Sequence, residues 1–450
     1  MSTVRPAAVA GLFYPRDPQA LAAELDDLLG GVEDFSPRLR APKALVVPHA
    51  GYVYSGPVAA RAYDELAPLR GSITRVVLLG PVHRVPVRGL ALPAADFFET
   101  PLGRIPLDRA WVEKTNDLPQ VVRSGPAHAM EHSLEVQLPF LQKALGAFSL
   151  VPFAVGDATV AEVAAVLERL WGGPETLVVI STDLSHYHAY DAARAIDGNT
   201  IERISRLATD IRHDEACGAT PLNGLLSLLR KKGLEVRLLA ANKSGDTAGG
   251  KGQVVGYSSF AVCEPGGAVS DDEAGATLLK IARAAIDSAL NGNNYHQDAA
   301  PGWLARPGAT FVTLTRGGAL RGCIGSLEAV QPLGLDVARN ALGAALRDPR
   351  FPAVSRDEWP AVRVEVSLLS AAKPIRFADE ADLLAQVRPG EDGIILECEG
   401  RRATFLPQVW ETLPDRKLFF TELLKKAGLA GARLGRCKVS RYRVWKWKET

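Results

Sequence analysis

The chain has 450 residues, of which 47% are apolar, so two or three domains with ordinary buried cores are expected. Its formal net charge of +1 gives no long-range field that would indicate a nucleic-acid or membrane partner. No run approaches about 18 consecutive apolar residues, and the N-terminus lacks the basic and apolar regions of a signal peptide, so we expect a cytoplasmic protein.

The first part of the chain alternates apolar strands with amphipathic helices. Most of its strands are short, continuous apolar runs, as in strands that are covered on both faces. This order predicts an α/β domain with a mostly parallel sheet and helices on both faces. The predicted strands are Ala44–Pro48, Arg75–Gly80, Leu150–Val155, Leu177–Ser181, Val236–Ala240 and Gln253–Cys263, and the predicted helices are Pro57–Leu66, Ser133–Leu145, Val160–Trp171, Ala192–Leu207 and Pro221–Lys232.

A Pro- and Gly-containing segment, Glu264–Glu273, separates this part from the rest, and Ser270 or Asp271 could cap the next helix. We therefore expect domains at residues 1–265 and 272–450. The second part predicts an α+β domain with an antiparallel sheet. Its helices are expected at Ala274–Leu290, Leu333–Leu346 and Lys417–Ala427, its hairpins at Thr310–Ile324 and Ile394–Leu406, and its single strands at Val362–Leu369 and Val439–Trp447.

The five cysteines are scattered, odd in number and without a CxxC pair. This usage indicates a reducing compartment and argues against a disulfide framework or a zinc ribbon. Cys217 precedes a predicted helix, where a thiol has a lowered pKa and can bind metal. The alternative is a small buried apolar side chain, which is the commoner fate of a cysteine.

Three of the eight histidines, His49, His83 and His186, lie just beyond predicted buried strands. In an open α/β sheet, ligands bind beyond the carboxyl ends of the strands, so residues from distant segments can meet there. Neutral imidazoles suit iron, zinc or copper. The pattern predicts a metal site, although a lone loop histidine is more often exposed or hydrogen-bonded without a function.

Further polar residues lie where they could complete such a site. Glu131 and His132 open a predicted helix, a position that often presents anions and donors. The same run also fits an ordinary helix start, with Ser133 or Glu135 satisfying backbone N–H groups. The dense polar run Ser181–His188 after an apolar strand suits a site better than a core.

Several of these strings resemble the Memo family over roughly residues 4–263. Because the strings recur in order, the resemblance is specific. They are Arg5-Pro-Ala-Ala-Val-Ala-Gly-Leu-Phe-Tyr-Pro15, Pro48-His-Ala-Gly-Tyr52, Gly80-Pro-Val-His83, Glu131-His-Ser-Leu-Glu135, Asp183-Leu-Ser-His186 and Ala216-Cys-Gly218. The family shares the fold of the LigB-type, non-haem iron(II) class III extradiol dioxygenases, so the resemblance implies that fold for the first domain.

The resemblance also implies that His49, His83 and Cys217 are the metal ligands, with Tyr52 as a further pocket candidate. The dioxygenases have a carboxylate as third ligand where a cysteine falls here, and a thiolate changes the redox properties of iron and also admits copper. We therefore expect Fe(II), with copper or zinc as alternatives. The remaining pocket residues, implied as acid–base or supporting groups, are Glu131, His132, Asp183 and His186.

The second domain resembles the AMMECR1 family over roughly residues 274–448, and that fold does not settle its role. Cys323 lies between two glycines near Arg321, so both residues are pocket candidates; the alternative is a tight hairpin with a buried cysteine. The strings that carry the resemblance are Leu320-Arg-Gly-Cys-Ile-Gly325, Asp348-Pro-Arg-Phe-Pro352, Val364-Glu-Val-Ser-Leu368, Gly393-Ile-Ile-Leu396 and Ala403-Thr-Phe-Leu-Pro-Gln-Val-Trp410.

These two families are associated with a third, radical-SAM protein in the AmmeMemoRadiSam system, so their fusion suggests action on one small-molecule or peptide substrate. Two hypotheses stay open. The first is a non-haem iron redox enzyme in which His132 or His186 moves a proton. The second is a binding module that holds iron or copper, or a peptide, without turnover. If Cys217 is only a packing residue, the site reduces to His49, His83 and His186, which suits zinc or iron.

Overall fold

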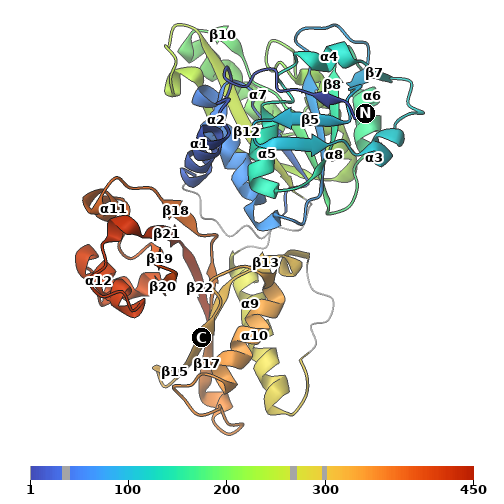
Figure 1. The fold of residues 1–450 in the computed structure, drawn as a ribbon. Helices are drawn as coiled ribbons and strands as arrows, with labels where there is room; N and C mark the ends of the chain where they lie inside the picture. The colour runs from blue at the N-terminus through green and yellow to red at the C-terminus, as the bar shows by residue number, and fades with distance from the viewer. Residues whose placement is uncertain (1, 33–40, 264–270, 296–301, 450) are drawn as a thin grey trace. The chain divides into compact units, whose positions relative to one another are not determined.

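A computed structural model describes residues 2–32, 41–263, 271–295 and 302–449 (Figure 1). They form two compact units: unit 1 (2–32 and 41–263) and unit 2 (271–295 and 302–449). The predicted two-domain organisation is confirmed. The exact limits, 1–265 and 272–450, stay a prediction, because the linker and its cap at 264–270 lie outside the described residues. Within the described ranges, no helix is long and apolar enough to cross a membrane.

Among its described residues, unit 1 is built on a nine-stranded sheet in the order β10-β12-β2-β9-β3-β8-β4-β7, with β11 also paired to β12. The centre, β2-β9-β3-β8, is parallel, as predicted. β12 and β4 run antiparallel to this centre, so the predicted parallel character holds only in part. The strands are β2 (Ala44–Val47), β3 (Arg75–Pro81), β4 (Leu90–Leu92), β7 (Val121–Arg123), β8 (Ser149–Val155), β9 (Thr176–Ser181), β10 (His186–His188), β11 (Glu235–Lys243) and β12 (Val254–Cys263).

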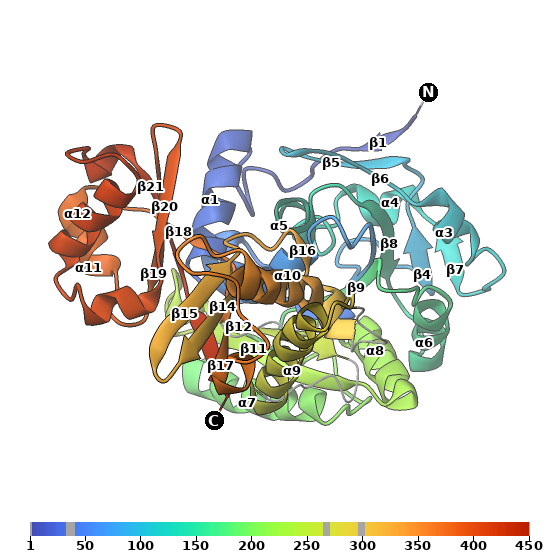
Figure 2. The same ribbon diagram turned by 90° about the horizontal axis from the view of Figure 1, so that it is seen from below.

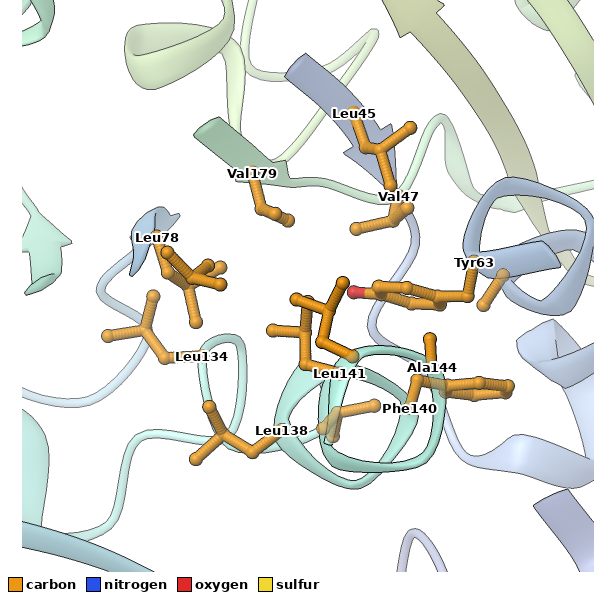
Figure 3. Close-up of a cluster of buried hydrophobic side chains, with 14 of the residues drawn as sticks. Leu45, Val47, Tyr63, Leu78, Leu134, Leu138, Phe140, Leu141, Ala144 and Val179 are labelled. Carbon is orange, nitrogen blue, oxygen red and sulfur yellow. The ribbon is translucent and has the colours of Figure 1, made fainter. Parts of the chain in front are cut away.

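The central strands are covered on both faces, which explains their continuous apolar runs. Leu45 and Val47 pack into one core with side chains of α2 and α5, such as Tyr63 (Figure 3). Ala44 and Val46 point into the opposite core, which α6 and α8 cover. The helices of unit 1 are α1 (Pro18–Gly30), α2 (Tyr52–Tyr63), α3 (Arg109–Glu113), α4 (Gly125–Ala129), α5 (Gln137–Leu145), α6 (Val160–Arg169), α7 (Tyr190–Ser205) and α8 (Ala219–Lys232), and a small side sheet holds β1 (Val4–Arg5), β5 (Phe97–Thr100) and β6 (Gly103–Pro106).

Unit 2 has the predicted α+β layout with antiparallel sheets. Its first sheet has the order β15-β14-β17-β22, and α9 and α10 lie side by side against it (Figure 2). Its second sheet has the order β18-β21-β19-β20. The elements are α9 (Asp271–Leu290), β13 (Pro307–Gly308), β14 (Thr310–Arg316), β15 (Ala319–Gly325), β16 (Gln331–Pro332), α10 (Leu333–Leu346), β17 (Val362–Leu369), β18 (Lys373–Ile375), α11 (Glu380–Gln386), β19 (Gly393–Cys398), β20 (Arg401–Phe405), α12 (Arg416–Lys426), β21 (Lys438–Tyr442) and β22 (Val444–Lys448).

The single strand predicted at Val439–Trp447 is wrong, because the chain changes sheets within it. β21 belongs to the second sheet and β22 to the first. Between them, Arg443 forms backbone and side-chain hydrogen bonds with Ser370, at 2.9 and 3.0 Å. Val439 packs into one core and Tyr442 into another. The alternation of apolar and polar residues therefore continues across the point where the chain passes from one sheet to the other.

Unit 2 also contains a disulfide, between Cys398 of β19 and Cys437. Both residues are buried in the core beneath the second sheet. The sequence-based argument against disulfides is therefore wrong for this pair, since cysteines 39 positions apart give no spacing signal. Cys217, Cys263 and Cys323 lie outside the disulfide.

Candidate metal centre

Three histidine side chains meet at the carboxyl ends of the central strands. His49 follows β2 and His83 follows β3, while His132 lies in the turns that precede α5. One candidate ligand atom from each lies within 4.8 Å of the other two. The imidazole centroids are 5.3 Å apart for His49 and His83, 5.4 Å for His49 and His132, and 4.7 Å for His83 and His132. The convergence of His49 and His83 follows from the parallel centre of the sheet.

The position of His132 corrects the predicted helix Ser133–Leu145. α5 begins only at Gln137. The non-helical segment before it places the His132 ring in the cluster. This ring stacks on His83, and Phe13 also packs against it, at 4.8 Å between ring centroids. Burial lowers the pKa of His132 to about 4, so the imidazole is neutral near pH 7 and can offer a lone pair.

Glu131 holds His83 in place. Its carboxylate accepts a hydrogen bond from the His83 backbone N–H at 2.6 Å and lies 2.9 Å from His83 Nδ1. Burial alone would raise the pKa of Glu131, but the hydrogen bonds from His83 and Ser133 lower it to about 2. An ionised carboxylate only accepts hydrogen bonds, so His83 carries a proton on Nδ1, and in the neutral form of this ring Nε2 is the nitrogen with the lone pair.

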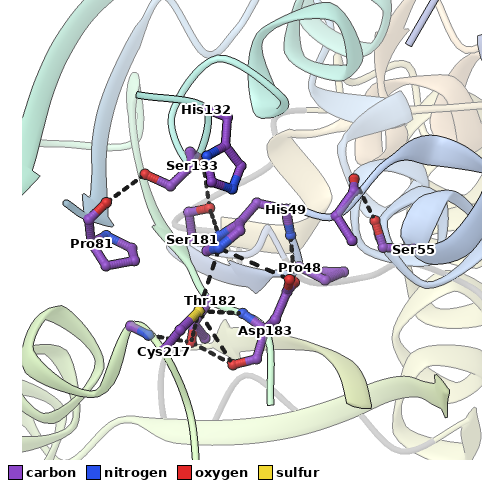
Figure 4. Close-up of polar contacts among 12 residues, drawn as sticks. Pro48, His49, Ser55, Pro81, His132, Ser133, Ser181, Thr182, Asp183 and Cys217 are labelled. Atoms are coloured by element: carbon purple, nitrogen blue, oxygen red, sulfur yellow. Dashed lines mark hydrogen bonds and ion pairs between the residues drawn. The ribbon is translucent and has the colours of Figure 1, made fainter. Parts of the chain in front are cut away.

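His49 is buried behind the cluster and is held by two residues at the end of β9 (Figure 4). Its backbone N–H donates to Asp183 Oδ1 at 2.7 Å, and its Nδ1 lies 2.8 Å from Ser181 Oγ. Burial, and then the neighbouring imidazoles His83 and His132, hold the pKa of His49 well below its ordinary value. Burial also raises the pKa of Asp183 to about 7, despite the hydrogen bond from His49.

Cys217 reaches the cluster from the segment before α8. Its Sγ lies 3.4 Å from His49 Nε2 and accepts a hydrogen bond from the Asp183 backbone N–H at 3.3 Å. Gly218 allows this approach, since a Cβ there would lie 2.6 Å from the side chain of Thr182. The predicted lowering of the thiol pKa is wrong: burial, and then the charge of Asp183, raise it to about 12. Among the described residues, the groups within hydrogen-bonding distance of the thiol belong to Thr182, Asp183 and His49, and none is a lysine or an arginine.

His186 lies beside the cluster rather than within it. Its Nδ1 is 2.8 Å from the Leu184 carbonyl, so that nitrogen carries the proton. Burial lowers the pKa of His186. The pairing of β10 with β12 shifts register at Tyr187, whose positive φ of 61° and 71% exposure mark a bulge at the edge of the sheet. The third histidine of the cluster is therefore His132, and not His186 as in the three-histidine alternative.

The three other pocket candidates are not members of this cluster. Tyr52 is buried in the core, where its hydroxyl donates to the Val136 carbonyl at 2.8 Å. In unit 2, Arg321 forms an ion pair with Glu358 at 2.6 Å. Cys323 accepts a hydrogen bond from Thr313 at 3.4 Å, and the cation beside it is Arg350, which donates to the Cys323 carbonyl at 3.1 Å.

Two residues that shape the site, Phe13 and Gln137, were not among the candidates from the sequence, and Ser181 was included only as part of the polar run Ser181–His188. Gln137 is fully buried and donates to Ser181 at 2.9 Å. The burial of Gln137 could have been predicted from its helical spacing to Leu141 and Ala144, because this spacing places a polar residue on the apolar face of α5.

His128 of α4, which lies outside the cluster, is expected to make the stability of unit 1 depend on pH. It is 1% exposed, and its Nε2 lies 2.7 Å from the Ala91 carbonyl. Burial lowers its pKa from 6.5 to about 4, so between these values the unfolded histidine binds a proton that the folded one does not. Unit 1 is therefore expected to lose stability as the pH falls through this window, by about 2 kcal/mol at pH 5 from this residue.

Denaturant unfolding of wild type and His128→Gln at pH 7 and pH 5 measures this loss. The glutamine amide can still donate to Ala91 but does not titrate, so wild type should lose about 2 kcal/mol more than the variant on acidification. Equal losses in the two proteins would contradict the lowered pKa of His128.

Comparisons with known proteins agree with this arrangement of units. Residues 5–261 match the family described as Memo-like protein, and residues 279–447 match the AMMECR1 family. A MEMO1 family protein of Sulfolobus acidocaldarius is 35% identical over 279 residues, which cover 57% of this chain and 98% of that protein. One of Thermotoga neapolitana is 38% identical over 273 residues, with the same coverage of 57% and 98%.

Among solved structures, an uncharacterized protein of Pyrococcus horikoshii is 31% identical, with a TM-score of 0.36, and the match covers 39% of this chain and 91% of that one. The two family matches together cover most of the described residues of both units. The chain therefore belongs to the Memo family, with an AMMECR1 domain fused behind its Memo domain in one polypeptide.

Proposed function

We propose that unit 1 is a metal-dependent redox enzyme, related to the class III extradiol dioxygenases, that binds one transition-metal ion at His49 and His83. The observation that carries the proposal is the cluster of three imidazoles whose candidate ligand atoms lie within 4.8 Å of one another. His83 donates its other ring N–H to a carboxylate, the usual support of a metal-binding histidine. Either Cys217 or His132 would be the third ligand.

The donor chemistry fits such an ion. Neutral imidazoles beside a thiol suit iron, copper or zinc better than magnesium or calcium, and we propose Fe(II). A bound iron(II) ion would supply Lewis acidity and one-electron redox chemistry. His186 can accept a proton at Nε2, because its Nδ1–H is directed to the Leu184 carbonyl. Asp183, with a pKa of about 7, can give or take a proton near neutral pH.

The proposal extends to the context of the fusion. We propose that unit 2 acts on the same small-molecule or peptide substrate in the cytoplasm, with a radical-SAM protein as partner. The presence of both family domains in one chain supports this extension by analogy.

Elemental analysis of protein purified without oxygen tests the metal site. Wild type is expected to contain about one transition-metal ion per chain, because its three imidazoles form one cluster, and His49→Ala with His83→Ala should contain almost none. His188→Ala is the matched control, since His188 lies at the end of β10 outside the cluster. Equal metal content in wild type and the double variant would rule out the site. Bound metal without oxygen or substrate consumption would favour storage or delivery over catalysis.

A further inference from the structure

A buried chain of hydrogen bonds lies behind His49 and leads away from the metal cluster. The Tyr63 hydroxyl donates to Gln137 Oε1 at 2.8 Å, and Gln137 Nε2 donates to Ser181 Oγ at 2.9 Å. Ser181 Oγ in turn lies 2.8 Å from His49 Nδ1. All four side chains are at most 2% exposed, so water does not compete for these hydrogen bonds.

The direction of the first hydrogen bonds is fixed by a backbone carbonyl. Gln137 lies 2.9 Å from the Pro48 carbonyl, which can only accept, so the amide nitrogen of Gln137 must face it. The same nitrogen faces Ser181, and the amide oxygen is left to accept from Tyr63. Rotating the amide would bring two acceptors together at Pro48, and this arrangement excludes the rotated form.

A second carbonyl fixes the proton of Ser181. Its Oγ lies 2.6 Å from the Ser133 carbonyl oxygen, a contact that requires the hydroxyl proton between the two oxygens. Ser181 then has only its two lone pairs left, and Gln137 occupies one of them. The other can only accept, so His49 must carry its proton on Nδ1. His49 Nε2, 3.4 Å from Cys217 Sγ, is the nitrogen with the free lone pair.

We propose that Ser181 and Gln137 are positioning residues that hold His49 in the Nδ1–H form and so present its Nε2 to the metal ion. This inference rests on the proposed metal site. The segment Glu131–Ser133 serves both histidines: the carboxylate of Glu131 accepts from His83, and the carbonyl of Ser133 accepts the Ser181 proton. One short segment therefore sets the proton position on two of the candidate ligands.

Nitrogen-detected NMR of metal-free protein with ¹⁵N-labelled histidine rings tests the proton positions directly. Wild-type His49 is expected to be protonated on Nδ1 alone. In Ser181→Ala the Nδ1–H loses its acceptor, and a mixture of the two proton positions should appear. Ser181→Thr, which keeps the hydroxyl, should restore the wild-type form. Ser259→Ala is the matched control, because Ser259 is fully buried and its hydroxyl has no hydrogen-bond partner among the described residues.

Titration of the same proteins with Fe(II) without oxygen completes the test. Ser181→Ala should bind Fe(II) about 10–100-fold more weakly than wild type, as for other residues that orient a ligand. Protonation of wild-type His49 on Nε2 would overturn the inference without any variant, and so would an unchanged proton position in a folded Ser181→Ala. A wild type with the Nδ1–H form that binds no Fe(II), copper or zinc would refute the metal site while leaving the hydrogen-bond assignment intact.

Discussion

Replacing Cys217 with serine is expected to weaken metal binding by more than about 100-fold, because the loss of a ligand exceeds the 10–100-fold effect of losing a supporting residue. In the metal-free protein burial raises the pKa of this thiol to about 12, so the metal must displace its proton. The thiolate charge-transfer absorption of copper- or iron-loaded protein should disappear in the variant. Cys217→Asp should restore part of the affinity, more for iron than for copper.

The pH dependence of affinity separates the two ligand sets. If Cys217 binds the metal, affinity should rise about tenfold per pH unit from pH 6 to 8, since each binding event releases the thiol proton. Cys217→Ser should remove that one-proton slope, and any slope from Asp183 should remain in both proteins. His132, with a pKa of about 4, adds no slope in this range.

Cys263→Ser and Cys323→Ser are suitable controls for this experiment, whereas Cys398 is not, because it pairs with Cys437. Both controls should keep the wild-type spectrum and affinity. Wild-type affinity and spectrum in Cys217→Ser would assign the thiol to packing and leave His49, His83 and His132 as the ligand set.

Replacing Glu135 with leucine is expected to destabilise unit 1 by about 3–5 kcal/mol, because it leaves the buried Arg5 guanidinium unpaired. Glu135 is 0% and Arg5 5% exposed, and the two form an ion pair. The same carboxylate accepts hydrogen bonds from the backbone N–H groups of Ala8 and Val9, at 2.8 and 2.9 Å, and from the Tyr14 hydroxyl at 2.6 Å. It therefore anchors the N-terminal segment that carries Phe13 against His132.

Denaturant unfolding of the metal-free protein measures this effect without the contribution of a bound ion. Arg5→Met combined with Glu135→Leu should recover part of the loss, because the double variant contains no buried unpaired charge. Glu168→Leu is the comparison, because Glu168 is exposed and pairs with Lys231 at the surface, so its loss should change stability by less than about 1 kcal/mol. A loss below about 1 kcal/mol for Glu135→Leu would contradict the role of the ion pair.

The part of the site that could be predicted from the sequence was the pair of histidines at the ends of β2 and β3. Continuous apolar runs mark β2 and β3 because both faces are buried, and the histidines that follow them had to meet at one edge of the sheet. His132 follows no strand. Its place depends on the turns before α5, which the helical spacing of the sequence concealed. Glu135 satisfies N–H groups of a distant segment rather than those of its own helix, a long-range contact that no local pattern encodes.

The direction of the strands, parallel or antiparallel, was harder to predict from the sequence than their positions. β11 and β12 are joined by a connection too short for a crossover helix, which was a usable sign of their antiparallel pairing. The α1 helix was also readable, since Asp17 caps it and Pro18 occupies its first turn. By contrast, the burial of Ser181 and Gln137 follows from tertiary packing, and their polarity alone would place them at the surface.

The spread of the cluster along the chain has a consequence for folding. An ion held by His49, His83 and either Cys217 or His132 would cross-link segments that are far apart in sequence, and so remove loop-closure entropy from any chain that unfolds around it. Such an ion would act as a reversible cross-link between segments at the parallel centre of the sheet. By mass action, the free metal concentration would then set how often unit 1 opens, and scarcity of the ion would expose this unit to proteolysis.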